Sequence, residues 1–230
     1  MNCERILIPP FGHLANANTQ LRHSAENAAW IWHPLRPVGE TAVLRFTLSF
    51  ELSAPASPVI HVTGDQRFQL RCDGRDVTFG PDRCDIEHWT VQSLQMELEA
   101  GKHEFEAIVW WLADPDAGSR TDQSGADLLP RPPMAQMTWR GGFLLHSDDL
   151  PVSTGTANWQ VADLTSSVRL FRQRILHYFD VGPSHDFDLA AWAVAKACAP
   201  AIIAAPLNPN DFGVRRPGWC LHPASLPEQR

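Results

Sequence analysis

Seven charged or aromatic residues in the first half of the chain have the chemistry needed to form a binding site. Carboxylate and guanidinium groups are planar, so each can bind two neighbouring hydroxyl groups of a sugar, and an indole ring can stack on a sugar face. The same acids and arginines can instead pair with one another and fix a loop. We favour this structural lock and keep sugar binding as the alternative. The candidate carbohydrate-binding residues are Asp65, Arg67, Asp82, Arg83, Asp85, Trp89 and Trp110.

Pairs of acids elsewhere in the chain raise the question of glycoside hydrolysis. An inverting mechanism needs two rigidly held carboxyl groups roughly 6.5–9.5 Å apart, one of them protonated. The pairs here lie beside Pro, Gly or Ser, in segments typical of loops, so we interpret them as solvated loop acids and predict no catalytic residue. They are Asp114/Asp116, Asp148/Asp149 and Asp186/Asp188.

Metal and nucleophile motifs are absent from the sequence. The ten His show no His-x-His or His-x-x-x-His spacing, the five Cys show no Cys-x-x-Cys spacing, and no Gly-x-Ser-x-Gly occurs. These absences argue against a metal hydrolase, a serine hydrolase, a disulfide framework and a structural zinc site. We therefore expect no metal and no cofactor. A calcium site at Asp82 and Asp85 stays open, because calcium binds oxygen ligands from loops.

A predicted β-hairpin must position the candidate residues. Phe68, Leu70 and Cys72 alternate with polar residues, Asp73-Gly74 follows, and the alternation then resumes until Gly80-Pro81. Successive side chains of a strand point to opposite faces, and Asp-Gly tolerates the positive φ of a tight turn. The pattern predicts two short strands joined by a turn, with a charged loop after them.

Alternating apolar residues predict further strands on both sides of the hairpin. Residues 44–52 alternate strictly, and shorter segments at 59–63, 94–98, 105–111 and 158–161 follow the same pattern. Trp110 and Trp111 must point to opposite faces, so at most one belongs to the core. The Ala-rich run 189–205 favours a helix on propensity alone.

Composition narrows the class of protein. The chain has 230 residues, 44% of them hydrophobic, and a net charge of −7. A mildly acidic chain repels nucleic acid and anionic lipid, so we expect neither as a partner. Nine Trp against one Tyr, with 19 Pro and 14 Gly, favour an all-β protein that could face sugars. No basic segment precedes an apolar run at the amino terminus, which predicts a cytoplasmic protein.

Several motifs, taken in order, resemble the amino-terminal β-sandwich region of bacterial α-L-rhamnosidases. Gly-Asp-x-Arg-Phe-x-Leu at 64–70 leads through the turn glycine to Gly-Pro-x-Arg-x-Asp at 80–85 and then to Trp89. A Trp-x-Trp at 30–32 precedes this stretch, and a strand ending in Val-Trp-Trp at 109–111 follows it. Residues 133–145 resemble a further stretch of the same region.

The resemblance implies an all-β fold, a jelly-roll-like β-sandwich of the galactose-binding type. It also implies that the catalytic acids belong to a separate helical barrel. Phe187-Asp188 and Trp192 to Ala195 resemble a family turn that leads into a strand, so we prefer a turn and strand to a helix at 189–205.

The predicted organisation is an arm at 1–25, a sandwich domain at 26–205 and a Pro-rich linker at 206–230 toward a catalytic part. The predicted function is the non-catalytic sandwich of an α-L-rhamnosidase-like glycoside hydrolase, which supports the barrel and could contact a rhamnose-containing glycan. The alternatives are a free-standing carbohydrate-binding module and a protein-binding scaffold domain.

Overall fold

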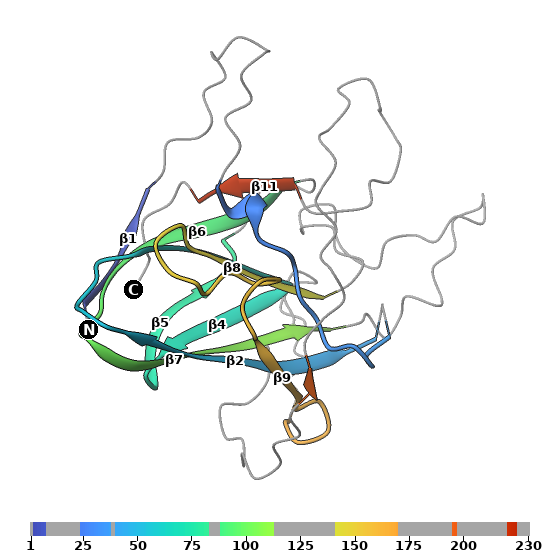
Figure 1. Ribbon diagram of the computed structural model, residues 1–230. Coiled ribbons are helices and arrows are strands. Elements are labelled where there is room, and N and C mark those ends of the chain that lie inside the picture. The colour runs from blue at the N-terminus through green and yellow to red at the C-terminus, as the bar shows by residue number, and fades with distance from the viewer. Residues whose placement is uncertain are drawn as a thin grey trace, which may run out of the picture.

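Two β-sheets face each other across an apolar core (Figure 1). The computed structural model describes residues 2–7, 24–37, 40–82, 88–112, 141–169, 195–196 and 220–224. Within these residues, one sheet contains five strands and the other contains six. A short 3-10 helix, η1 (Ser24–Asn27), is the helical element among them.

The five-stranded sheet has the order β1-β6-β3-β8, and β11 also pairs with β6. Its pairs are antiparallel except for β11, which runs parallel to β6. The strands are β1 (Asn2–Ile6), β3 (Val59–Asp65), β6 (His88–Glu97), β8 (Gly142–His146) and β11 (Cys220–Pro223).

The six-stranded sheet is antiparallel throughout, with the order β10-β9-β2-β7-β4-β5. Its longest pair, β2 with β7, runs in register from Ala42↔Trp111 to Leu52↔Gly101. The strands are β2 (Ala42–Leu52), β4 (Arg67–Cys72), β5 (Arg75–Gly80), β7 (Gly101–Trp111), β9 (Gln160–Asp163) and β10 (Ala195–Lys196).

The predicted hairpin is confirmed as β4 and β5. Asp73 and Gly74 both have positive φ, 52° and 72°, as a type I′ turn requires. This turn matches the right-handed twist of the strands, which is why an Asp-Gly pair between alternating segments is a strong local signal. The ladder shifts register once, between Leu70 and Arg71.

The main core lies between the sheets and is built on aromatic contacts. Phe143 of β8 stacks on Phe46 of β2, with ring centroids 5.2 Å apart, and meets Trp159 edge-on at 5.3 Å. Trp159 is 1% exposed, and its indole N–H donates to the carbonyl of Val152 at 2.9 Å. Burial of these rings supplies a large hydrophobic contribution and links the two sheets directly.

Smaller apolar clusters cover the outer face of each sheet. Trp30, Trp89 and Leu144 pack with η1 on the five-stranded sheet, while Val43, Ile108 and Leu164 pack on the six-stranded sheet. Half-buried Trp110 joins the second cluster. Trp111, next in sequence, is 8% exposed, and strand alternation points it to the opposite face.

The β-sandwich predicted from the sequence is confirmed, and its jelly-roll character stays a prediction. Within the predicted arm, Asn2–Ile6 forms edge strand β1, and within the predicted linker, Cys220–Pro223 forms β11. Of the run 189–205, Ala195–Lys196 forms β10 and the rest lies outside the described residues.

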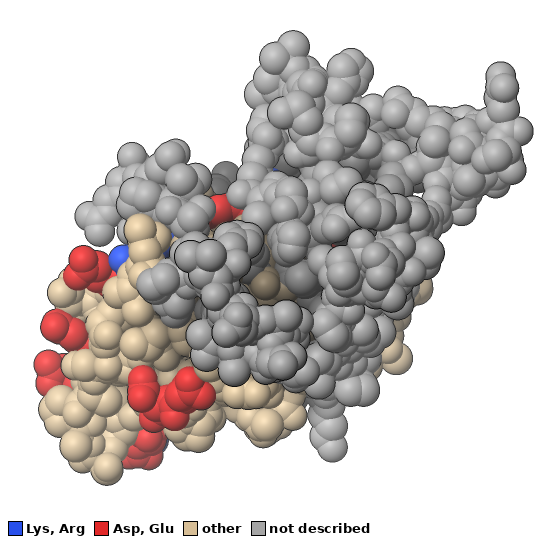
Figure 2. Space-filling view, turned by 90° about the horizontal axis from the view of Figure 1, so that it is seen from above, with Lys and Arg blue, Asp and Glu red and all other residues tan. Residues whose placement is uncertain are grey.

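The surface seen from above carries more acidic than basic side chains where the described residues form it (Figure 2). This agrees with the net charge of −7. Within the described part of the chain, no helix has the length and apolarity needed to cross a membrane.

Candidate functional site

Most of the predicted site residues gather where the chain passes from one sheet to the other. β3 ends at Asp65 in the five-stranded sheet and β4 begins at Arg67 in the six-stranded sheet. Gln66 lies between them and is 6% exposed. We call this region, formed by residues 64–67 with the ends of β5 and β7, the crossover end.

The side-chain amide of Gln66 holds the crossover end together. Its Nε2 donates to the carbonyl of Leu112 and its Oε1 accepts from the N–H of Leu112, both at 3.1 Å. The backbone N–H of Gln66 donates to the carbonyl of Trp110 at 3.0 Å. Paired bonds of this kind satisfy buried polar groups, and losing them is costly.

Arg67 and Asp65 are placed among protein groups. The Arg67 guanidinium donates to the carbonyls of Gln66 and Pro81 at 3.2 and 3.5 Å, and Arg67 lies opposite Trp110 in the ladder. Asp65 is 1% exposed. A buried carboxylate and a guanidinium bonded to the backbone have little room to receive a sugar.

Asp82 forms an ion pair with Arg5 of β1. The Arg5 side chain is 5% exposed and that of Asp82 is 23% exposed. Gln92 adds a contact from its Nε2 to Asp82 Oδ1 at 3.4 Å. Asp82 is therefore held by an ion pair with an arginine from edge strand β1. Arg83 and Asp85, and with them the alternative calcium site, lie outside the described residues.

The two predicted tryptophan platforms differ in exposure. Trp89 is 4% exposed, and its indole N–H donates to the carbonyl of Gly64 at 3.2 Å. Its ring faces therefore contact protein. Trp110 is half-buried against Val43 and Ile108 on the outer face of the six-stranded sheet.

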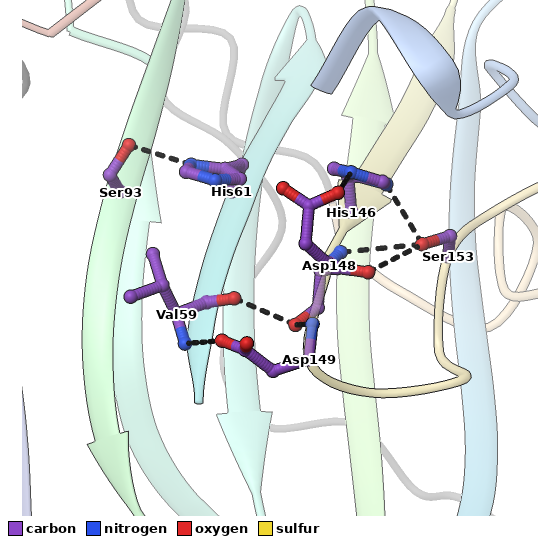
Figure 3. A network of polar contacts seen from close by, with 8 residues as sticks. Val59, His61, Ser93, His146, Asp148, Asp149 and Ser153 are labelled. Carbon is purple, nitrogen blue, oxygen red and sulfur yellow. Dashed lines mark hydrogen bonds and ion pairs between the residues drawn. The ribbon is translucent and has the colours of Figure 1, made fainter. Parts of the chain in front are cut away.

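A second polar network, which the sequence did not indicate, joins β8 to the loop that follows it (Figure 3). His146 contacts Ser153 Oγ through Nδ1 at 2.9 Å and Asp148 through Nε2 at 3.0 Å. The His146 ring stacks near that of His61, with centroids 6.1 Å apart, and His61 Nδ1 lies 2.8 Å from Ser93 Oγ.

The Asp148–His146–Ser153 arrangement has the residue types of a serine hydrolase, but its bonds indicate a clamp. Ser153 Oγ also donates to the carbonyl of Ser147 and accepts from its N–H, both at 3.3 Å. A nucleophile needs its hydroxyl free to attack. Asp149, the neighbouring acid, accepts the N–H of Val59 at 2.9 Å. The network thus fixes the loop against β3.

One group among the described residues brings three metal-binding side chains together: Cys72, Asp73 and His103, whose ligand atoms all lie within 4.8 Å of one another. Burial raises the pKa of the Cys72 thiol to about 12. Burial is the largest single influence and acts to raise the pKa of Asp73 and lower that of His103. Their mutual hydrogen bond, backbone hydrogen bonds and charge attraction together outweigh it, so the Asp73 pKa is lowered and the His103 pKa raised.

Comparisons with known proteins identify the fold. No protein-family model and no curated protein matches this chain. Its structure is similar to a GH78 family rhamnosidase of Bacillus sp. GL1, with a TM-score of 0.50 and 20% identity over 86% of this chain and 20% of that one. The chain therefore spans about one fifth of the length of that enzyme.

Two further solved structures show weaker similarity. An α-L-rhamnosidase from Dictyoglumus thermophilum gives a TM-score of 0.46 and 13% identity over 86% of this chain and 22% of that one. A Pleurotus ostreatus lectin gives a TM-score of 0.41 and 12% identity over 76% of this chain and 42% of the lectin chain. At these identities the similarity concerns the fold. The resemblance to the sandwich region of α-L-rhamnosidases is confirmed at that level.

Proposed function

We propose that this chain is the non-catalytic β-sandwich of a glycoside hydrolase similar to α-L-rhamnosidases, and that it packs beside the catalytic domain. The observation that carries the proposal is the extent of the fold match: 86% of this chain corresponds to 20% of the Bacillus rhamnosidase. The ordered motifs around Phe68 and Trp111 point to the same enzymes. The predicted cytoplasmic location and the absence of a nucleic-acid or membrane partner belong to this proposal.

The engagement of acidic side chains supports a non-catalytic role. Asp82 pairs with Arg5, and Asp149 accepts a backbone N–H. Burial acts to raise the pKa of Asp163, but hydrogen bonds from Arg36 and Thr165 outweigh it and lower that pKa. A carboxyl group whose pKa is lowered stays ionised at neutral pH and cannot serve as the general acid.

Turnover of an aryl α-L-rhamnoside by the purified chain tests this role. We expect none. Turnover that disappears in Asp148→Asn but persists in Asp76→Asn would contradict the proposal. The two carboxylates form a matched pair, because their side chains are 63% and 68% exposed.

Packing beside a catalytic domain is tested by calorimetric titration of the chain with a separately produced rhamnosidase barrel domain. We expect a saturable complex. Absence of binding would contradict the packing part of the proposal, and a chain that binds other proteins through an apolar face would instead be a scaffold domain.

A carbohydrate-binding role is the second candidate, and it is favoured by Trp110, whose indole ring is only half-buried on the outer face of the six-stranded sheet. If the chain binds sugar there, rhamnose should raise the melting temperature and Trp110→Ala should remove the shift. Phe79→Ala is the control, because Phe79 is 66% exposed and belongs to neither apolar cluster on the sheet faces. A shift that survives Trp110→Ala excludes this surface.

A further inference from the structure

The turn of the β4–β5 hairpin brings a thiol, a carboxylate and an imidazole to one place. Cys72 is the last residue of β4, Asp73 is in the turn, and His103 lies near the start of β7. β4 and β7 are paired with Cys72 opposite Phe105, so His103 is two residues beyond the partner of Cys72. Residues two apart on a strand share a face, so His103 lies on the same side of the sheet as Phe105.

Backbone hydrogen bonds hold two of these side chains in position. Asp73 Oδ1 accepts the N–H of Glu104 at 2.9 Å, while Oδ2 lies 2.8 Å from His103 Nδ1. The backbone N–H of Asp73 also donates to the carbonyl of Glu104 at 2.9 Å. The turn is therefore tied to β7, and the Asp73 carboxylate cannot swing away without breaking these bonds.

The other nitrogen of His103 has the partner that a metal-binding histidine normally has. Nε2 lies 2.8 Å from the carbonyl of Glu99, to which it can only donate. Histidine ligands almost always donate their second N–H to a carbonyl or carboxylate, which fixes the ring and the tautomer. That bond leaves Nδ1 as the coordinating atom, and Nδ1 faces Asp73. The ring also packs against Phe50, with centroids 5.5 Å apart.

We propose that Cys72, Asp73 and His103 form a binding site for a divalent transition metal ion of the zinc type. Thiolate and imidazole ligands select zinc and related ions, whereas calcium and magnesium prefer sites made of oxygen atoms. Three protein ligands leave a fourth tetrahedral position for water or another side chain.

Metal binding at this site releases protons. The Cys72 S–H loses its proton to solvent as sulfur coordinates the ion, and His103 gives up the proton on Nδ1, while the Asp73 carboxylate is already ionised. Ligands must be deprotonated before they bind a metal, so the apparent affinity falls as the pH is lowered. The ion enters from the turn, where the Asp73 side chain is 38% exposed, and reaches the buried sulfur of Cys72.

Cobalt(II) is the first probe, because a thiolate bound to cobalt gives a charge-transfer absorption in the near ultraviolet. We expect this band to saturate at one cobalt per chain in the full 230-residue protein and to disappear when zinc is added. It should be lost in Cys72→Ala. Absence of the band in the unchanged protein would overturn the proposal.

If Cys72→Ala folds poorly, the variants Asp73→Asn and His103→Gln still test the proposed metal site. Asp73→Asn retains a residue that tolerates positive φ, so the turn should survive. We expect it and His103→Gln to weaken zinc binding by at least about 10-fold, the lower end of the effect of removing even an outer partner of a ligand. His33→Gln is the matched control and should bind as the unchanged chain does. Equal zinc affinity in His103→Gln and His33→Gln would overturn the assignment.

Discussion

Strand β4 begins at Arg67, where the chain has just crossed between the sheets, and ends at Cys72, beside the hairpin turn. At the first end, polar side chains bond mainly to backbone groups, as Gln66 does to Leu112 and Arg67 does to Pro81. At the second end, Asp73 and His103 bond to each other close to the surface.

The two ends of β4 therefore differ in how easily their polar side chains could leave their present hydrogen-bond partners and bind a ligand. A ligand at the crossover end would have to replace buried backbone hydrogen bonds, at a cost of roughly 1–3 kcal/mol for each group left unpaired. A metal ion at the turn would replace only protons and one ion pair between side chains. The sequence motifs predict a binding site at the crossover end. The side chains that could exchange their partners for a ligand, Asp73 and His103, instead lie at the other end of β4.

Among the variants that test this comparison, we expect Gln66→Ala to lose the most stability. The change removes both hydrogen bonds between the side-chain amide and Leu112, so we expect the free energy of unfolding to fall by roughly 2–5 kcal/mol. Urea denaturation of the purified chain measures it. Gln160→Ala is the control, because the Gln160 amide bonds at the surface to Asn158, and it should change stability by no more than about 0.5 kcal/mol. Similar values for both variants would mean that the crossover end is not held by this amide.

A second test removes the ion pair between β1 and the loop. Arg5→Met leaves the partly buried carboxylate of Asp82 without its main partner, and we expect a loss of about 1–3 kcal/mol. Asp82→Asn in the same background should then cost little more, because the partner is already gone. The double-mutant cycle measured by urea denaturation gives the coupling between the two residues. Strictly additive effects would show that the ion pair between Arg5 and Asp82 does not stabilise the fold.

The fold could be predicted where the signal is local. Asp73-Gly74 specifies its own turn, and residues 44–52 alternate because one face lies in the core, so both predictions are confirmed. The pairing of Arg5 with Asp82 could not be foreseen, because 77 positions separate the two residues and only the docking of β1 beside β6 brings them together.

The group formed by Cys72, Asp73 and His103 could not be predicted from sequence motifs, for a similar reason. Cys72 and His103 belong to different strands, and no fixed spacing connects them. Once the hairpin is predicted, however, pairing β4 with residues 101–111 would have placed His103 beside the turn. Strand register was the missing information, because the register decides which side chains share an end of the sheet.

A third test addresses the turn itself. Gly74 has φ of +72° and no atom within 4 Å of an added Cβ, so Gly74→Ala introduces only conformational strain. We expect a loss of about 1–2 kcal/mol, measured by urea denaturation. Gly74→Asn should cost less, because Asn tolerates the left-handed region. If Gly74→Ala lowered the free energy of unfolding more than Gln66→Ala did, the turn would contribute more to stability than the Gln66 hydrogen bonds at the other end of β4.

The smallest effect concerns Asp163, a partly exposed carboxylate on the crossover side of the six-stranded sheet. Its oxygens accept from Arg36 and from the N–H and hydroxyl of Thr165, the last two at 2.9 and 2.6 Å. These bonds outweigh burial, which acts in the other direction, and lower the Asp163 pKa from the ordinary value of 3.8. Because the folded state holds the ionised form, this stabilisation is complete above the unfolded pKa and is lost as the pH falls through the folded pKa.

The expected outcome for Asp163→Asn is therefore a difference that depends on pH. At neutral pH the variant should be less stable than the unchanged chain by about 0.5–1.5 kcal/mol, the contribution of a typical hydrogen bond. The difference should shrink as the pH is lowered past the unfolded pKa and vanish below the folded one, as measured by urea denaturation over that range. Asp76→Asn, at a carboxylate 68% exposed, provides the comparison at the hairpin. A difference for Asp163→Asn that stays constant down to the lowest pH would mean that the charge of Asp163 contributes nothing to the stability of the fold.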